Sequence, residues 1–362
     1  MSIVTIIGAG MMGSAMARPA SDNGHEVRLI GSPLDDFIID ALKAGKDHPT
    51  LKRSFAGVAK ADYISGVTEA LKGADVVVAG ISSFGVDWFT ENILPVLPSG
   101  VLVVSITKGM LLGKDGRLTV FPHHFAEKRS DLSFVAVGGP CICFELFDRR
   151  HTMVYYCGRN MEAVKKAKAV FGTSYYHILP STDTIGVECS VALKNAYAMG
   201  VSLAVGLAER EKGITDERGI TENCVPGAPD LNPVYNPQAA LFAQSCLEMR
   251  RIVELLGGNG KIVANLPGAG DLYVTVFGGR TRRLGTLLGR GLKYARVKEV
   301  LSGVTLEAVA IITRVAEFLR QASRRGEADL KQFPLMMHMD SILNKEAPVA
   351  LDWDSFGEPE NV

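Results

Sequence analysis

Three glycines near the amino terminus have the spacing of a nucleotide-binding turn. Gly8, Gly10 and Gly13 form G-x-G-x-x-G between an apolar run at residues 2–7 and a helical pattern at residues 14–23. In such a turn the first glycine permits a tight bend, the second admits a pyrophosphate, and the third allows close helix–strand packing. The helix amino terminus adds unbonded N–H groups and a positive dipole end. A second apolar strand follows, so the motif has the context it requires and predicts a dinucleotide site.

The end of that second strand decides between NAD and NADP. An acidic residue there usually accepts a hydrogen bond from the ribose 2′-OH of NAD. Here residues 30–33 read Ile-Gly-Ser-Pro, and the first carboxylates are those of Asp35 and Asp36. Without an acid, a 2′-phosphate meets no repulsion and Ser32 can donate to it. We therefore predict that NADP is slightly favoured over NAD and that both are used.

The longest apolar helical pattern, at residues 185–207, is interrupted by Glu188, Lys194 and Asn195, and one face of it is broken by Lys194 alone. The other members of its helix face are apolar or small: Val187, Val191, Ala198 and Ser202. Lys194 is costly in such a place unless it is paired or meets a ligand. Burial lowers a lysine pKa, which suits a proton donor. The alternative is a lysine that reaches solvent or pairs with a carboxylate, and a buried Asp271 is one residue that could orient it.

Further basic residues stand where ligands bind in open α/β sheets. Lys108 and Gly139 follow the apolar runs at residues 101–106 and 134–137, at the carboxyl ends of predicted parallel strands. A cluster of three arginines follows a glycine pair and could clamp a phosphate through bidentate hydrogen bonds: Arg280, Arg282 and Arg283. A surface lysine and a solvated basic helix start explain these patterns equally well.

Strand and helix patterns alternate up to about residue 184, and long helical patterns without strand alternation follow. The alternating pattern predicts an α/β fold with a Rossmann-type doubly wound parallel sheet, and the helical pattern predicts an all-α domain. We place a dinucleotide-binding domain at residues 1–184 and a helical substrate-binding and catalytic domain at residues 185–362. Residues 210–235, rich in Gly, Pro, Asn and charge, predict an inserted loop.

Composition excludes several classes of protein. Lys plus Arg and Asp plus Glu both number 39, so the net charge is zero and a general nucleic-acid binder is not expected. The six cysteines form no zinc or disulfide pattern, and His123 and His124 are adjacent rather than at ligand spacing, so no metal is predicted. No apolar run reaches about 18 residues and no basic n-region opens the chain. We predict no membrane span and a cytoplasmic location.

Taken in their order, these motifs resemble the NAD(P)-dependent glycerol-3-phosphate dehydrogenase family. The resemblance covers nearly the whole chain, roughly residues 3–345. The Ala-Leu-Lys-Asn and Gly-Asp-Leu blocks with the following arginines are specific together. The matching blocks are residues 8–13, His48-Pro49, Thr107-Lys108-Gly109, Gly139-Pro140, Gly186-Val187-Glu188, Ala192-Leu193-Lys194-Asn195, Gly270-Asp271-Leu272, Arg280 with Arg282-Arg283, and Glu307.

The resemblance implies a role for each matching residue. Lys194 would donate a proton to the ketone oxygen, with Lys108 and Asp271 as the other catalytic residues. The implied substrate-binding residues are Lys108, Gly139, Cys141, Lys194, Asp271, Thr275, Arg280 and Thr281. The implied cofactor-binding residues are Gly8, Gly10, Met11, Met12, Gly13, Ser32, Ser82, Phe84, Lys108, Cys143, Arg280 and Glu307.

The resemblance also implies an activity, the reversible NAD(P)H-dependent reduction of dihydroxyacetone phosphate to sn-glycerol 3-phosphate, feeding phospholipid and glycerol metabolism. A homodimer acting on a small phosphorylated substrate is implied too. The chain departs from the family at Thr281, where asparagine is usual, and at Cys141 and Ile142. Two alternatives remain open: a two-domain dehydrogenase of the ketopantoate reductase or 3-hydroxyacid type, and an inactive NADP-binding sensor.

Overall fold

The computed structural model describes residues 1–220 and 234–358 and divides the chain into two compact units. The first unit comprises Met1–Lys108 and Val120–Glu188, and the second comprises Gly109–Thr119 and Cys189–Val362. A short segment from the first half of the chain thus belongs to the second unit. The two contiguous domains 1–184 and 185–362 stay a prediction, because compactness alone does not test independent folding.

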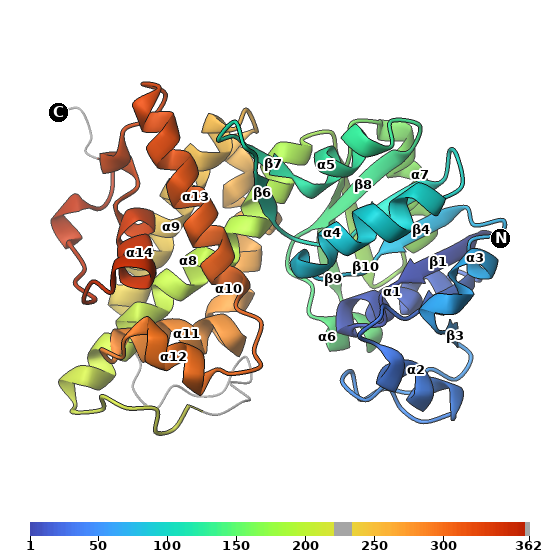
Figure 1. Ribbon diagram of the computed structural model, residues 1–362, viewed down its shortest axis with the longest axis horizontal. Coiled ribbons are helices and arrows are strands. Elements are labelled where there is room, and N and C mark those ends of the chain that lie inside the picture. The colour runs from blue at the N-terminus through green and yellow to red at the C-terminus, as the bar shows by residue number, and fades with distance from the viewer. Residues whose placement is uncertain (221–233, 359–362) are drawn as a thin grey trace. The chain divides into compact units, whose positions relative to one another are not determined.

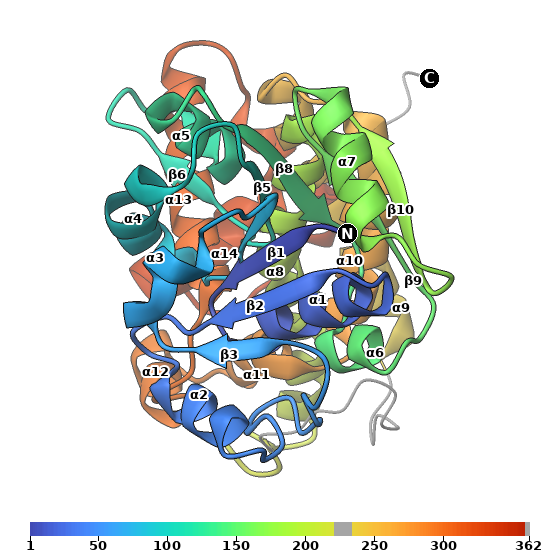
Figure 2. The same cartoon turned by 90° about the vertical axis from the view of Figure 1, so that its right-hand side faces the viewer.

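An eight-stranded sheet forms the centre of the first unit (Figure 2). All neighbouring strands run parallel except β8 and β9, which are antiparallel. The sheet confirms the predicted Rossmann-type fold, with one antiparallel junction that was not foreseen. In spatial order the strands are β3 (Lys60–Asp62), β2 (Glu26–Ile30), β1 (Ile3–Ile7), β4 (Val76–Ala79), β5 (Leu102–Ser105), β8 (Ser133–Gly138), β9 (Thr152–Cys157) and β10 (Tyr176–Ser181).

The central strands form because their sequences are almost continuously apolar, as in parallel sheets that are covered on both faces. All four residues of β4 and of β5 are buried. Met16 and Val164 lie on different helices and are both fully buried in the core cluster that includes these strands. The helices of the unit are α1 (Met11–Asp22), α2 (Asp36–Lys43), α3 (Val67–Ala70), α4 (Val86–Trp88), α5 (Phe121–Lys128), α6 (Cys143–Phe147) and α7 (Met161–Phe171).

Strand β10 ends shortly before the predicted domain boundary at residue 184. It pairs in parallel with β9 over its whole length, and Pro180 lies opposite Tyr156. β10 is the outermost strand of the sheet, where a missing proline N–H leaves no ladder partner unsatisfied. The strand was not recognised in the sequence, and it lies within the predicted dinucleotide-binding domain, residues 1–184.

The second unit is built around one long apolar helix, α8 (Thr184–Glu211), most of which belongs to it. This helix is long and apolar enough to cross a membrane, but 78% of its most apolar window is buried inside the structure, as in a core helix. Figure 1 shows the remaining helices gathered around it. They are α9 (Tyr235–Leu255), α10 (Asp271–Val276), α11 (Gly279–Gly289), α12 (Tyr294–Val300), α13 (Glu307–Arg324) and α14 (Pro334–Lys345).

Every regular element described after residue 184 is helical, which confirms the predicted all-α structure there. The prediction lacked one part, a hairpin of β6 (Met110–Leu112) and β7 (Leu118–Val120). Arg314 of α13 holds β6 by donating from Nη1 to the carbonyl of Met110 at 2.8 Å. Residues 221–233 of the predicted loop 210–235 lie outside the described residues.

Candidate active site

The glycine turn of the first unit has the shape of a phosphate cradle. Gly8 has φ of +106°, and a Cβ there would lie 2.5 Å from the carbonyl oxygen of Gly80. A Cβ on Gly13 would lie 2.3 Å from the oxygen of Gly8. A Cβ on Gly10 would meet nothing within 4 Å, although this residue precedes the first turn of α1 and no side chain caps the helix. The protein itself thus requires two of the glycines, and the third leaves open space beside uncapped N–H groups.

Two side chains from the following segments fix this turn. The Asp35 carboxylate accepts hydrogen bonds from the N–H of Ala9 at 2.9 Å and of Ser32 at 2.7 Å. On the other side, Nε2 of His48 contacts the Ala9 oxygen at 2.9 Å and Oγ of Ser14 at 3.0 Å. Neither Asp35 nor His48 was predicted to act in the turn, because neither contact follows from spacing.

The protonation state of His48 follows from its partners. Nδ1 lies 3.1 Å from the N–H of Leu51 and 3.3 Å from that of Thr50, so it accepts. Nε2 therefore carries the hydrogen and donates to Ala9. The ring is fully buried, and burial lowers the pKa of His48. We conclude that a neutral histidine ties residues 48–51 to the glycine turn.

The other predicted residues of this unit follow the carboxyl ends of parallel strands. Lys108 follows β5 and Gly139 follows β8, and Nζ of Lys108 donates to the Gly139 carbonyl at 3.5 Å. Ser82 and Phe84 lie just after β4, with Phe84 exposed. Because these strands and β1 are parallel, their carboxyl ends share one edge of the sheet.

Three of the predicted residues of this unit stand at the start of helices, and each of them is half-buried or exposed. Met11 and Met12 begin α1, and Cys143 begins α6. Cys141 and Cys143 are half-buried, and burial raises the pKa of the Cys143 thiol. A thiol held neutral in this way is a packing and contact residue rather than a nucleophile.

The second unit brings Lys194 and Asp271 into direct contact. Nζ of Lys194 lies 2.5 Å from Oδ1 of Asp271, with the lysine side chain 12% and the aspartate 1% exposed. Between residues 186 and 206 of α8, only Lys194 and Asn195 are not fully buried. Asp271 is the first residue of α10. The sequence hypothesis that this aspartate could orient the lysine thus has its contact in the structure.

Polar side chains close in sequence to this pair make further hydrogen bonds. Oγ1 of Thr275 donates to the Asp271 carbonyl at 2.6 Å, one helical turn away. Nδ2 of Asn195 donates to Oε2 of Glu307 at 3.2 Å. Asn195 was noted only as part of a matching block, and its placement beside Lys194 on α8 gives it a contact with a predicted cofactor residue.

The arginine cluster divides into one exposed residue and two that are more enclosed. Arg280 and Thr281 stand in the first turn of α11, with Arg280 exposed and Thr281 half-buried. Nη1 of Arg282 donates to the Val276 carbonyl at 2.9 Å, and Arg283 is 9% exposed. Arg280 is therefore the member of the cluster best placed to meet a phosphate from solvent.

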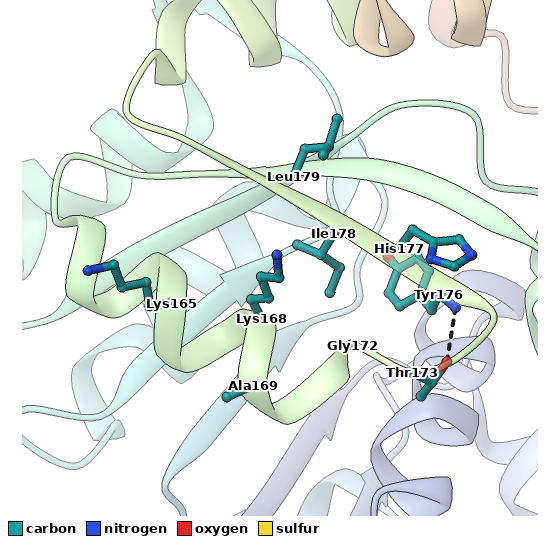
Figure 3. Close-up of a pocket in the computed structure, with 9 residues that line it drawn as sticks. All are labelled: Lys165, Lys168, Ala169, Gly172, Thr173, Tyr176, His177, Ile178 and Leu179. Carbon is teal, nitrogen blue, oxygen red and sulfur yellow. Dashed lines mark hydrogen bonds between the residues drawn. The ribbon is translucent and has the colours of Figure 1, made fainter.

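A separate groove of about 610 Å³ runs beside the edge strand β10. Figure 3 shows Lys165 and Lys168 of α7 on one side of it and His177 of β10 on the other. The ring of His177 stacks against that of His151, and Nε2 of His177 lies 3.0 Å from Nδ1 of His151. None of the nine residues lining this groove is a predicted site residue.

Comparison with known proteins covers both units. Residues 3–164 match the family model of the amino-terminal part of NAD-dependent glycerol-3-phosphate dehydrogenase, and residues 183–351 match the model of its carboxy-terminal part. A solved structure of glycerol-3-phosphate dehydrogenase from Coxiella burnetii has the same fold, with a TM-score of 0.74 and 22% identity over 96% of both chains.

Two curated relatives show the similarity at the level of sequence. A protein from Archaeoglobus fulgidus named NADP(+)-dependent glycerol-3-phosphate dehydrogenase is 32% identical, covering 91% of this chain and 92% of its own. One from Bacillus velezensis named glycerol-3-phosphate dehydrogenase [NAD(P)+] is 29% identical, covering 85% and 82%. With its cradle for a dinucleotide and its buried lysine–aspartate pair, the chain belongs to the NAD-dependent glycerol-3-phosphate dehydrogenase family.

Proposed function

We propose that this chain is an NAD(P)-dependent oxidoreductase that reduces dihydroxyacetone phosphate to sn-glycerol 3-phosphate, reversibly. The observation that carries the proposal is the contact of Lys194 with Asp271 at 2.5 Å in a nearly solvent-free setting. A lysine held by a buried carboxylate stays positioned and charged, as a proton donor to a ketone oxygen must be. Family membership supplies the substrate class.

The residues of the glycine turn fit a dinucleotide. The open space at Gly10 and the uncapped N–H groups at the start of α1 would hold the pyrophosphate. Met11, Met12, Ser32, Ser82, Phe84 and Cys143 are the proposed further contacts on this side. When bound, the reduced nicotinamide supplies the hydride. The protein's own part is to fix its position and to keep the turn rigid through Asp35 and His48.

Lys194 and Lys108 are the proposed electrostatic partners of the reacting oxygen. Lys194 would transfer a proton from Nζ to the developing alkoxide and take up its replacement from solvent, while Asp271 keeps Nζ in place. Lys108 would add positive charge and contact both substrate and nicotinamide, with Gly139 and Cys141 lining the substrate. Thr275 would support the position of Asp271 through its bond to the backbone there.

Arg280 and Thr281 are the proposed phosphate holders. A guanidinium binds phosphate through two parallel hydrogen bonds, and a hydroxyl can add a third. Fixing the phosphate also fixes C2 of the ketone, which converts binding energy into orientation. Arg280 and Glu307 are proposed to contact the cofactor as well.

The decisive experiment is steady-state kinetics with dihydroxyacetone phosphate and, in parallel, NADH and NADPH. We expect both cofactors to be oxidised, and Lys194→Ala to lower kcat by about 10²–10⁴-fold, the usual loss for a general acid. Lys72→Ala, a change at a lysine that is 69% exposed, is the matched control and should keep the wild-type rate. No turnover with either cofactor, or a full rate in Lys194→Ala, contradicts the proposal.

A second measurement separates this activity from that of a dehydrogenase for unphosphorylated substrates. Arg280→Ala should raise KM for dihydroxyacetone phosphate about 10-fold or more, because a charge-assisted contact to phosphate is lost. Dihydroxyacetone itself, which lacks the phosphate, should be reduced equally poorly by both proteins. A KM that does not change in Arg280→Ala favours the ketopantoate reductase type instead.

Cofactor preference and assembly complete the proposal. NADP is favoured because residues 30–33 carry no acid, although the Asp35 carboxylate reaches back to the turn. We also propose that residues 1–184 and 185–362 act as the nucleotide-binding and catalytic domains of a cytoplasmic homodimer. Light scattering coupled to gel filtration measures the assembly, and a mass of one chain, 38.9 kDa, contradicts the dimer.

A further inference from the structure

One carboxyl group of the first unit has no evident structural purpose. Glu188, the fifth residue of α8, is completely buried, and neither of its carboxyl oxygens has a hydrogen-bond partner within the described chain. The other fully buried glutamate, Glu248, differs, because its oxygens accept from the N–H of Leu335 and Met336 and from Tyr197. Glu188 is therefore an exception to the rule that buried polar groups are bonded.

The groups that face Glu188 come from the ends of the neighbouring strands. Lys108, after β5, is the cation whose field acts on it. Cys157, the last residue of β9, is a fully buried thiol that feels the charge of Glu188 in turn. Asp183, just before α8, acts on the same thiol. The cation that acts on Glu188, Lys108, is also the residue proposed to contact substrate and nicotinamide.

The protonation state of Glu188 follows from its burial. Ionising it without hydrogen-bond donors in an enclosed site is very unfavourable. Burial therefore raises the pKa of Glu188 to about 8, and the charge of Lys108 opposes this only in part. At neutral pH the group is therefore a neutral acid and does not act as a counter-ion of Lys108.

We propose that Glu188 is a positioning residue that sets the charge offered by Lys108 to an anionic ligand. While it is protonated, Glu188 does not offset the positive charge of Lys108. When it loses its proton to solvent, the carboxylate becomes the counter-ion of Lys108 and the pair presents no net charge. This inference rests on the proposed function, which places Lys108 beside the substrate and the cofactor.

The test is the pH dependence of ligand binding in the full-length protein. In the wild type, KM for dihydroxyacetone phosphate should rise at least about fivefold between pH 7 and pH 9.5, the effect of cancelling one charge near an anion. In Glu188→Gln, which has the same shape but cannot ionise, the rise should be less than about twofold. An unchanged rise in Glu188→Gln overturns the inference.

Two further variants separate the role of Glu188 from the proposed placement of Lys108. Glu248→Gln changes the other fully buried glutamate and should keep the wild-type pH profile. Lys108→Met should raise KM at pH 7 and also abolish the further rise toward pH 9.5, because the charge that Glu188 cancels is gone. If Lys108→Met leaves KM unchanged at pH 7, the proposed placement of Lys108 fails. If it raises KM while Glu188→Gln keeps the alkaline rise, only the inference about Glu188 fails.

A spectroscopic readout does not depend on turnover. The infrared spectrum at pH 7 should contain the carbonyl band of a protonated, buried carboxylic acid that disappears by pH 9.5. Subtracting the same pH difference measured on Glu188→Gln isolates this group from Glu248. Absence of that band from the subtracted spectrum shows that Glu188 does not lose a proton between pH 7 and pH 9.5, and it overturns the inference even where the variant has lost activity.

Discussion

The Asp271 carboxylate holds Lys194 by direct contact. It is almost completely buried and touches Nζ at 2.5 Å. We predict that Asp271→Asn lowers kcat at least about 10-fold, because the amide keeps the shape but no longer stabilises the charged lysine. KM for dihydroxyacetone phosphate should change much less, since the phosphate is held elsewhere. Steady-state kinetics at saturating NADPH measure both constants.

A change in KM without a change in kcat would contradict the role of Asp271 in positioning Lys194. If Asp271→Asn raises KM and leaves kcat unchanged, the aspartate contributes to substrate binding rather than to the position of the proton donor. Circular dichroism and the thermal midpoint serve as the control for folding. Thr275→Val, which removes only the hydroxyl bonded to the Asp271 carbonyl, should have a smaller effect on kcat in the same direction.

His48 gives the molecule a definite response to acid. Burial lowers the pKa of His48, so in the window below the unfolded value of about 6.5 the unfolded chain binds more protons than the folded one. The stability that this residue contributes is therefore fully present above pH 6.5 and is lost as the pH falls. A charged ring would also turn Nδ1 into a donor facing the N–H groups of Leu51 and Thr50.

We predict that His48→Gln lowers the free energy of unfolding at pH 7.5 by about 1–3 kcal/mol, through broken buried hydrogen bonds. At pH 5.5 the difference from wild type should be smaller, because the wild type loses stability as His48 is protonated and glutamine cannot be protonated. Urea unfolding at the two pH values measures this. Other buried histidines titrate in both proteins and cancel in the comparison. A difference that grows on acidification contradicts the neutral His48.

At the scale of elements, α8 and α11 approach each other through glycines. A Cβ on Gly285 would lie 2.3 Å from the carbonyl oxygen of Met199, and one on Gly289 would lie 2.4 Å from that of Leu203. A Cβ on Gly206 of α8 would lie 2.0 Å from the oxygen of Thr286. The helix that carries Lys194 is thus held by backbone contact over two turns of its partner.

We predict that Gly285→Ala destabilises the protein by about 1–3 kcal/mol, the usual cost of overpacking. Alanine is the better helix former by about 1 kcal/mol, so a change in an open helix position would have the opposite sign. The thermal midpoint measures the effect, with the exposed Lys166→Ala as control. A Gly285→Ala protein as stable as wild type shows that α8 and α11 can separate without cost.

Elements with a strong and uninterrupted pattern could be predicted from the sequence, and those defined by a neighbour could not. The runs at β1 and β5 are almost entirely apolar and were recognised. β10 was missed because Pro180 is a strand breaker except at a sheet edge, and edge position is a property of the whole sheet. The hairpin β6–β7 has only three residues in each strand and is fixed by a contact to α13.

The same distinction holds for the site. The spacing of Gly8, Gly10 and Gly13 predicts the turn because the motif is local. The role of His48 in fixing it depends on a side chain that returns across 39 positions of sequence to Ala9. Glu188 stood in a matching block, but only the burial of its two oxygens distinguishes it from an ordinary core residue. Long-range contacts of this kind have no signature in a single sequence.

For the whole molecule, the chain passes between its two units three times, at Lys108, at Thr119 and at Glu188. Two of these positions are the residues of the proposed charge pair. The proposed ligand contact at Lys108 therefore lies at a position in the sequence where one unit ends and the other begins. Stability measured with and without ligand reports on this, because a ligand that binds only the folded state stabilises all of it.

The stability of the complete chain tests the cradle without any assay of turnover. NADPH at 100 times its Kd should stabilise the wild type by about 2.7 kcal/mol, and a larger rise in the thermal midpoint with NADPH than with NADH at equal concentration would establish the preference for NADP. Gly10→Ala should unfold at the wild-type temperature when no nucleotide is present, since the added Cβ meets nothing within 4 Å. The same methyl group occupies the space through which a pyrophosphate would approach, so the nucleotide-induced rise should be lost. A Gly10→Ala protein that is stabilised as strongly as wild type would place the nucleotide away from the glycine turn.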